Sequence, residues 1–343
     1  MLPLKNYQRT ILYTLLHLVV DGICAAIIFK YLYTENYSTC LTVFLIYNFL
    51  AFLSQPFVGY LMDIYNRPKF FLMISILFLC LGYFLNFNYI FSAICLGIGN
   101  SFFHICGGKD VTIHSNNDII SLGIFVSTGA IGLMLGQRYV SDILIIVFIS
   151  LLFVCSAFIF LAKEEEVIQT RISGTIGQSK VGFILMLILV LVVGIRSFVG
   201  KIVILDFEVA PWMFVLIAVA TTLGKMTGGV VAKFIGIRKT ILVSMVVAIL
   251  CLCIFNTNPY SLALGIFTFN FSMPITLWYA NRLFKGKEGF AFGLLAATLI
   301  PGYLLGMLDY PVLAIKLSIA LLSGISVLLV IIVEKRMHCY GCN

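Results

Sequence analysis

The sequence consists largely of apolar runs separated by short turns that contain charged residues, glycine, proline or asparagine. A helix needs roughly 20 apolar residues to cross the hydrocarbon core of a bilayer, where every backbone polar group must be paired within the protein. The runs therefore predict an all-α membrane protein with twelve transmembrane helices. The predicted spans are 10–30, 40–62, 69–86, 89–107, 119–137, 142–162, 181–200, 209–232, 239–255, 259–281, 289–308 and 312–333.

The composition excludes a water-soluble protein. Hydrophobic residues make up 62% of the chain and charged residues 10%, whereas soluble domains contain about 25% charged residues. We expect a multi-pass protein of the cell membrane, with the lipid bilayer as a partner and a monomeric state. The net charge of +8 does not indicate nucleic acid, because basic residues do not alternate with aromatic ones on a polar face.

The basic residues predict the orientation, because Lys and Arg favour the cytoplasmic side of a membrane protein. With both termini in the cytoplasm, three basic residues lie in outer turns, namely Lys30, Arg138 and Lys201. Sixteen lie in cytoplasmic segments: Lys5, Arg9, Arg67, Lys69, Lys109, Lys163, Arg171, Lys180, Lys233, Arg238, Lys239, Arg282, Lys285, Lys287, Lys335 and Arg336. We therefore predict that both termini are cytoplasmic.

The chain is predicted to be a duplication. Its longest polar stretch, 163–180, falls between the sixth and seventh spans and has the composition of a cytoplasmic linker. It would join an N-terminal six-helix bundle, 1–162, to a C-terminal bundle with a short tail, 181–343. A charged turn at Gln55–Lys69 has a weaker copy at Gly229–Lys239. Two halves of equal topology, related by an axis along the membrane normal, are typical of one class of transporters.

With its paired turns, the chain resembles the major facilitator superfamily (MFS). Gly59, Asp63, Arg67 and Lys69 match the family's loop between the second and third helices, and Gly229, Gly236, Arg238 and Lys239 match the loop between the eighth and ninth. The resemblance implies two pseudo-symmetric bundles and alternating access. It also implies that these two turns act as gates, whereas the residues alone would equally allow anchors of the topology. The implied gating residues are Gly59, Asp63, Arg67, Lys69, Gly229, Arg238 and Lys239.

Within the superfamily, the chain is most similar to the fosmidomycin-resistance group of drug exporters. The similar motifs are His17-Leu18-x-x-Asp21, Gln55-Pro56-x-Val58-Gly59, Gly97-x-Gly99-Asn100-Ser101-x-Phe103-His104, Tyr279-Ala280 and Gly286-x-x-Gly289-x-x-x-Gly293-Leu294. The turn departs from the family at Asn66 and Pro68, its copy has Lys233 in place of an acid, and Gly129-x-x-Gly132-x-x-x-Gly136 lacks the exporters' usual proline. Its spacing still allows close helix packing.

Ionisable side chains inside a bilayer are costly and therefore indicate function. Asp21 lies near the middle of the first span, with His17 four residues earlier on the same helical face. His104 lies in the fourth span, four residues after Asn100, and imidazole titrates near neutral pH. We predict Asp21, His17 and His104 as proton-coupling residues; structural hydrogen bonds are the alternative.

Five polar residues in the spans are candidates for substrate contact. Arg196 has no acidic residue near it in sequence and can hold an anionic group, pair with Asp21 or reach the outer headgroups. Asn270, Trp278 and Asn281 fall on one stripe of the tenth span together with Pro274, which suits either a cavity or a packing face. The predicted substrate-binding residues are Asn100, Arg196, Asn270, Trp278 and Asn281.

No enzyme motif is present, neither a Walker-type loop nor GxSxG nor HExxH. We expect neither a cofactor nor a metal ion; the tail His338-Cys339-x-x-Cys342 holds fewer than the about four ligands of a structural zinc site. The sequence therefore predicts a secondary transporter driven by an ion gradient or by the gradient of its own substrate. The expected activity is proton-coupled antiport, with efflux of a small drug or metabolite and drug resistance as its consequence. Metabolite uptake and a transporter-like sensor or scaffold without transport remain as alternatives.

Overall fold

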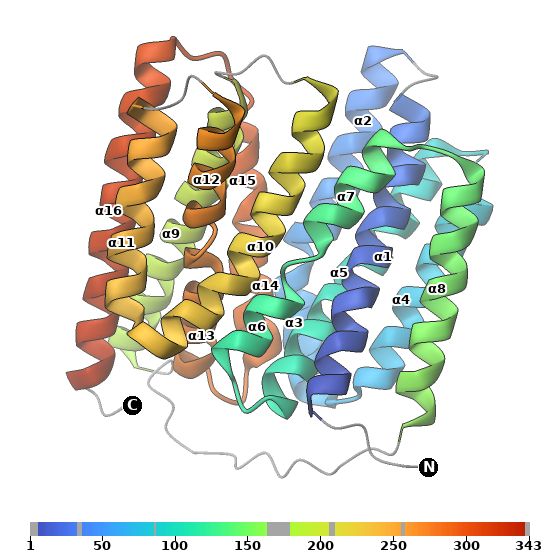
Figure 1. The fold of residues 1–343 in the computed structure, drawn as a ribbon. Coiled ribbons are helices and arrows are strands. Elements are labelled where there is room, and N and C mark those ends of the chain that lie inside the picture. The colour runs from blue at the N-terminus through green and yellow to red at the C-terminus, as the bar shows by residue number, and fades with distance from the viewer. Residues whose placement is uncertain are drawn as a thin grey trace. The chain divides into compact units, whose positions relative to one another are not determined.

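The computed structural model describes residues 6–32, 36–85, 87–162, 179–205, 210–254 and 258–339, and these residues form helices and no strand (Figure 1). Eleven helical segments are long and apolar enough to cross a membrane, and α4 is a shorter apolar helix. The predicted all-α fold with twelve transmembrane helices is confirmed. Most of the predicted linker 163–180 lies outside the described residues.

Seven spans are single helices: α1 (Asn6–Leu32), α4 (Pro68–Phe84), α5 (Tyr89–His114), α8 (Asp142–Leu161), α9 (Lys180–Leu205), α10 (Pro211–Ile235) and α16 (Val312–Cys339). The other five are divided. They comprise α2 (Tyr37–Asn48), the π-helical turn η1 (Phe49–Leu53) and α3 (Gln55–Tyr65); α6 (Ile119–Phe125) and α7 (Gly129–Arg138); α11 (Ile237–Ile249) and the π-helical turn η3 (Leu250–Ile254); α12 (Pro259–Phe269) and α13 (Ser272–Leu283); α14 (Glu288–Ala297) and α15 (Leu299–Leu305).

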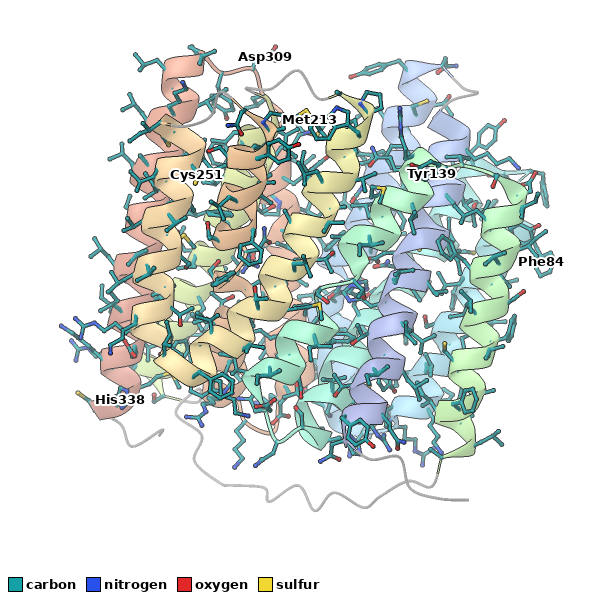
Figure 2. The ribbon with its side chains drawn as sticks, in the orientation of Figure 1. Phe84, Tyr139, Met213, Cys251, Asp309 and His338 are labelled. Carbon is teal, nitrogen blue, oxygen red and sulfur yellow. The ribbon has the colours of Figure 1, made fainter. Side chains whose placement is uncertain are left out.

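Large apolar side chains point away from the helices on many outer surfaces (Figure 2). Phe84 at the end of α4 is 69% exposed, and Ile143 in α8 is 76% exposed. Exposed apolar surface of this extent is unfavourable in water and favourable in lipid. The outer surface therefore agrees with a multi-pass membrane protein.

The helices form two compact units. The first unit contains Met1–Asn117, Ile124–Gln169 and Lys287–Ala297, and the second contains Asp118–Gly123, Thr170–Gly286 and Thr298–Asn343. Each unit thus includes a short segment that the sequence-based division at 163–180 assigns to the other half. One unit boundary, between Gln169 and Thr170, falls inside the predicted linker. The division into 1–162 and 181–343 stays a prediction.

In the first unit, α1 packs against α5, α7 and α8, and Figure 1 shows α7 crossing close to α1. The close approach depends on Gly129, Gly132 and Gly136 of α7. A Cβ at Gly132 would collide with the backbone carbonyl oxygen of Leu18, and one at Gly136 with that of Gly22. The small residues let the helix backbones touch, as the spacing in the sequence indicates.

A second glycine contact joins α3 to α14 within the first unit. A Cβ at Gly59 would overlap the carbonyl oxygen of Gly289, and a Cβ at Gly293 that of Gln55. The turn that follows α3 ends in Asn66, which has a left-handed backbone conformation with φ 47°. Asparagine tolerates this conformation better than other residues with a side chain. The departure from the family's glycine at Asn66 therefore preserves the turn.

In the second unit, α9 packs against α13, α15 and α16, and α10 packs against α11, α12 and α13. The tenth span breaks between α12 and α13 at Asn270 and Phe271. Pro274 follows in the first turn of α13, where its missing N–H leaves no helical hydrogen bond unmade. The predicted stripe of Asn270, Pro274, Trp278 and Asn281 is thus divided between two helices.

Candidate functional site

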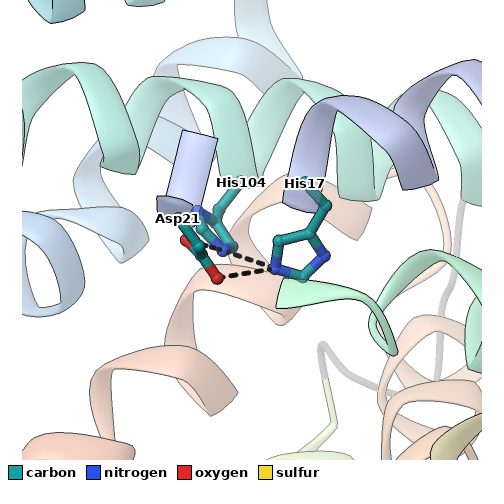
Figure 3. A group of neighbouring side chains, drawn as sticks. All are labelled: His17, Asp21 and His104. Carbon is teal, nitrogen blue, oxygen red and sulfur yellow. Dashed lines mark hydrogen bonds and ion pairs between the residues drawn. The ribbon is translucent and has the colours of Figure 1, made fainter. Parts of the chain in front are cut away.

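The strongest candidate site is a cluster of His17 and Asp21 from α1 and His104 from α5, all in the first unit (Figure 3). The Nε2 atom of His17 lies 3.3 Å from Oδ2 of Asp21 and 3.0 Å from Nε2 of His104. Nε2 of His104 lies 3.6 Å from Oδ1 of Asp21. The structure therefore brings the three predicted coupling residues together.

The hydrogen bonds of the two rings determine where their protons lie. Nδ1 of His17 lies 2.7 Å from the carbonyl oxygen of Phe125, and Nδ1 of His104 lies 3.0 Å from that of Asn100. A carbonyl oxygen only accepts, so each Nδ1 carries a proton. Two neutral rings would then face each other with lone pairs on both Nε2 atoms. The 3.0 Å contact has the length of a hydrogen bond, in which one Nε2 donates and the other accepts beside the Asp21 carboxylate.

The same three side chains offer ligand atoms that lie within 4.8 Å of one another, a set that can hold a metal ion. Two nitrogen ligands of a tetrahedral zinc ion lie about 3.4 Å apart, since each is about 2.05 Å from the metal. The separation of 3.0 Å between the Nε2 atoms is that of a hydrogen bond.

The surroundings hold this cluster in place. Asn100 of α5 is 1% exposed, and its side-chain amide donates to Oδ1 of Asp21 at 3.1 Å. Phe103 and Phe125 pack against the ring of His17, with ring centroids 6.0 and 5.2 Å away. A Cβ at Gly129 of α7 would collide with the side chains of His17 and Asp21. Glycine at this position thus leaves the space that the cluster occupies.

A second polar site in the first unit surrounds Asp63, a predicted gating residue. Its Oδ1 lies 3.1 Å from Nζ of Lys109, and both side chains are at most 5% exposed. The backbone N–H groups of Gly289 and Phe290 donate to its carboxylate at 3.0 and 2.8 Å. These N–H groups begin α14, so the carboxylate caps the positive end of that helix dipole. Asp63 therefore binds the start of α14 rather than Arg67, which is exposed.

Lys109, Asp110 and His114 were not among the predicted site residues, because the predicted fourth span ends at 107. The helix continues to His114 and carries these side chains into the unit. Asp110 is 2% exposed and lies 2.9 Å from Nη1 of Arg9 and 3.2 Å from Nδ1 of His114. The sequence did contain one signal of this site, namely the adjacent opposite charges Lys109 and Asp110 directly after Gly107-Gly108.

The other predicted gating residues occupy helix ends. Lys69 donates from Nζ to the carbonyl oxygens of Phe160 and Ala162, at 3.1 and 2.7 Å, and so caps the end of α8. In the second unit, a Cβ at Gly229 would lie 2.5 Å from the carbonyl oxygen of Ile119 in α6. Arg238 and Lys239 are exposed at the start of α11.

The base at Lys233, where the first turn has an acid, has a partner in the second unit. Its Nζ lies 2.7 Å from Oδ1 of Asp118, whose other carboxylate oxygen accepts the backbone N–H of Ser121. The second turn therefore also reaches the beginning of a helix, α6, but with the charges reversed. The departure at Lys233 is matched by the acid at Asp118.

The predicted substrate-binding residues are distributed over both units. Asn100 belongs to the cluster of the first unit. Asn270 ends α12 and donates to the carbonyl oxygen of Ile266. Trp278 of α13 is half-buried beneath the guanidinium of Arg282, which lies 3.9 Å from the ring centroid, and Asn281 is 2% exposed. Arg196 of α9 is 9% exposed and donates to the hydroxyl of Thr276 at 3.3 Å.

His338 and Cys339 are exposed at the end of α16, and Cys342 lies outside the described residues. Among the described residues, the group whose side chains could together hold a metal ion is His17, Asp21 and His104.

Comparison with known proteins gives the fold. No protein-family model and no curated protein match the sequence. The E. coli fucose:proton symporter FucP is similar in structure, with a TM-score of 0.70 and 12% sequence identity over 95% of this chain and 98% of that one. A second structure of FucP, described as an MFS transporter in the outward conformation, also has a TM-score of 0.70 at 12% identity, over 94% of this chain and 98% of that one. The human organic anion transporter MFSD10 has a TM-score of 0.65 and 12% identity over 95% and 99% of the two chains. This chain therefore has the fold of the major facilitator superfamily transporters.

Proposed function

We propose that the protein is a secondary active transporter that moves a small molecule across the cell membrane by alternating access, coupled to protons. Support comes from the fold and, above all, from the 3.0 Å contact between the Nε2 atoms of His17 and His104 beside Asp21. The motifs shared with the fosmidomycin-resistance exporters favour efflux by antiport, with drug resistance as its consequence.

The cluster binds one transferable proton. When the proton lies between the two imidazoles, the positive charge is balanced by the Asp21 carboxylate and the cluster is neutral overall. When the proton leaves, two lone pairs face each other next to a carboxylate, and the contact between α1 and α5 becomes repulsive. Proton release thus favours a different packing of these two helices, which is the differential stability that coupling requires.

The other groups near the cluster do not replace it as the proton carrier. Cys24 of α1 and Tyr47 of α2 interact electrostatically with Asp21, and Asn100 is not ionisable. From α7 the cluster meets the backbone at Gly129. A thiol and a phenol have ordinary pKa values of about 8.5 and about 10, whereas that of imidazole is about 6.5. Imidazole is therefore the side chain of the three whose ordinary pKa lies nearest to neutral pH.

The Asp63 site supplies a gate in this proposal. Its carboxylate is held by two backbone N–H groups of α14 and by Lys109, so the contact between α3 and α14 is stable as long as these bonds persist. Breaking them separates two helices that otherwise touch through Gly59 and Gly289. A transition between two discrete arrangements of this kind is a common basis of switching.

Substitution of Asp21 by asparagine tests the coupling. A transported compound is first identified by a thermal-shift screen of metabolites and antibiotics at two pH values. In proteoliposomes, an imposed pH gradient is expected to accelerate transport by the natural protein, whereas Asp21→Asn and His104→Gln should transport at the rate measured without a gradient. The amide cannot balance the cationic imidazole, and glutamine cannot share a proton with His17.

The matched control is Asp142→Asn, which changes an exposed carboxylate that pairs with Lys30 at the surface and should leave the acceleration unchanged. Acceleration of Asp21→Asn equal to that of the natural protein would remove the cluster from the coupling mechanism.

Uptake is the second candidate, and one observation favours it: FucP, which has the same fold, is a fucose:proton symporter. The side on which the compound accumulates under an imposed pH gradient distinguishes symport from antiport. Accumulation of the compound on the side to which protons flow indicates symport, and accumulation on the opposite side indicates antiport.

A further inference from the structure

Three lysine or arginine side chains are buried in the described part of the chain, namely Arg9, Lys109 and Arg196. Arg9 lies 2.9 Å from a carboxylate oxygen of Asp110, and Lys109 lies 3.1 Å from one of Asp63. Among the residues that the structure describes, no carboxylate pairs with Arg196. Its hydrogen bond is to the neutral hydroxyl of Thr276. Arg196 therefore differs from the other two buried cations in the absence of a balancing charge.

The position of Arg196 makes the lack of a counter-charge energetically costly. It lies within the apolar span Lys180–Ile204 of α9 and is 9% exposed. Burial of a cation without a counter-charge is unfavourable, and more so in a membrane than in water. Its guanidinium is directed toward α13 by the bond to Thr276, so it does not extend along the lipid-facing surface to the headgroups. A residue of this kind is retained when an anion from outside the chain completes its environment.

The hydrogen-bonding capacity of Arg196 indicates the class of anion. A guanidinium has five N–H donors in one plane, and Nη1 uses one of them on Thr276 at 3.3 Å. The hydroxyl of Thr276 donates its own proton to the carbonyl oxygen of Met273 at 3.0 Å, so toward Arg196 it is an acceptor. Thr276 thus fixes one side of the guanidinium. The remaining parallel N–H groups match two oxygens of one planar or tetrahedral oxyanion.

We propose that Arg196, positioned by Thr276, binds the anionic group of the transported compound, and that this group is a carboxylate or a phosphate-type oxyanion. The inference rests on the proposed transport function and specifies its substrate class. Both residues belong to the second unit, whereas the proton cluster belongs to the first. The anion site and the proton site are therefore built from different side chains and can be tested separately.

The test measures the thermal midpoint of the purified full-length protein in detergent with matched pairs of compounds. Benzoate is compared with benzamide, phenylphosphonate with its dimethyl ester, and sodium chloride serves as a simple anion. We expect at least one oxyanion to raise the midpoint with saturation, while its neutral partner does not. The shift should be absent in Arg196→Gln and reduced in Arg196→Lys, because lysine keeps the charge but loses the paired donors.

Lys201→Gln is the matched control. Lys201 lies in the same helix, with Nζ 5.1 Å from the ring centroid of Tyr303, and its replacement removes one positive charge without touching Arg196. This variant should keep the oxyanion shift. The ligand-free midpoint of Arg196→Gln should equal or exceed that of the natural protein, because the substitution removes a buried charge that has no carboxylate partner.

Four results would overturn the inference: no oxyanion raises the midpoint, chloride raises it as much, Arg196→Gln keeps the shift, or Arg196→Gln lowers the ligand-free midpoint strongly. The last result would show that Arg196 has a structural partner. Proton-driven transport of a neutral or cationic compound would also contradict it while leaving the proposed function intact. Conversely, an oxyanion shift that depends on Arg196, together with normal coupling in Asp21→Asn, would contradict the proposed proton coupling alone.

Discussion

Substitution of Asp63 by alanine is expected to destabilise the first unit by about 3–5 kcal/mol, the usual cost of leaving one partner of a buried ion pair alone. The change leaves the ammonium of Lys109, which is 1% exposed, without a carboxylate, and leaves the N–H groups of Gly289 and Phe290 without their acceptor. The effect is measured as a lower thermal midpoint of the purified protein, together with faster proteolysis in the turn after α3.

Two further variants show whether the buried ion pair is the cause. Asp142→Ala removes an exposed carboxylate that lies 2.6 Å from Lys30, and exposed pairs contribute only about 0–1 kcal/mol. The double variant Asp63→Ala, Lys109→Met also removes the unpaired buried charge and should recover part of the lost stability. The recovery is incomplete because α14 remains without its cap. A midpoint of Asp63→Ala equal to that of Asp142→Ala would contradict the assigned role of this pair.

Substitution of Gly132 by leucine is expected to prevent the close packing of α1 and α7. Already the first side-chain carbon would overlap the carbonyl oxygen of Leu18, and a backbone oxygen cannot rotate away. Overpacking of a core usually costs about 1–3 kcal/mol, and a clash between two backbones lies at or above the upper end. Because α7 also covers His17 and Asp21, the variant should lose both thermal stability and the pH dependence of transport.

The control for this prediction is Gly200→Leu in α9, where an added Cβ meets no atom within 4 Å. The same change of residue should be tolerated there, because the new side chain points into open space. Equal stability of the Gly132 and Gly200 variants would show that the contact between α1 and α7 is not tight.

The number of helices and the grouping of His17 with Asp21 could be predicted from the sequence because both depend on local patterns. Span length follows from apolar runs, and His17 and Asp21 share a face of α1 by their spacing alone. The contact of His104 with both residues could not be derived, since it depends on how α5 packs against α1. The direction of each Nδ1 toward a carbonyl oxygen required the structure as well.

The residues around Asp63 were predicted less well for a different reason. Arg67 was the nearest base in sequence, whereas the base that pairs with Asp63 is Lys109, which is 46 residues away and buried. Helix ends are the least certain part of any prediction from sequence, and an error of a few residues in the fourth span placed Lys109 and Asp110 in a turn. The pairing of Lys233 with Asp118 was also not predicted, because Asp118 lies in the short connection before α6.

The presence of Lys287–Ala297 in the first unit has a consequence for biosynthesis. The rest of that unit is complete once Gln169 has been made, but α14 follows only after roughly 130 further residues, which take about 6–26 s at about 5–20 residues per second. During this interval Asp63 has Lys109 but not the N–H groups of α14, and Gly59 has no backbone to touch. The newly made chain therefore spends seconds with the α14-facing surface of α3 uncovered and with two of the hydrogen bonds to Asp63 not yet formed.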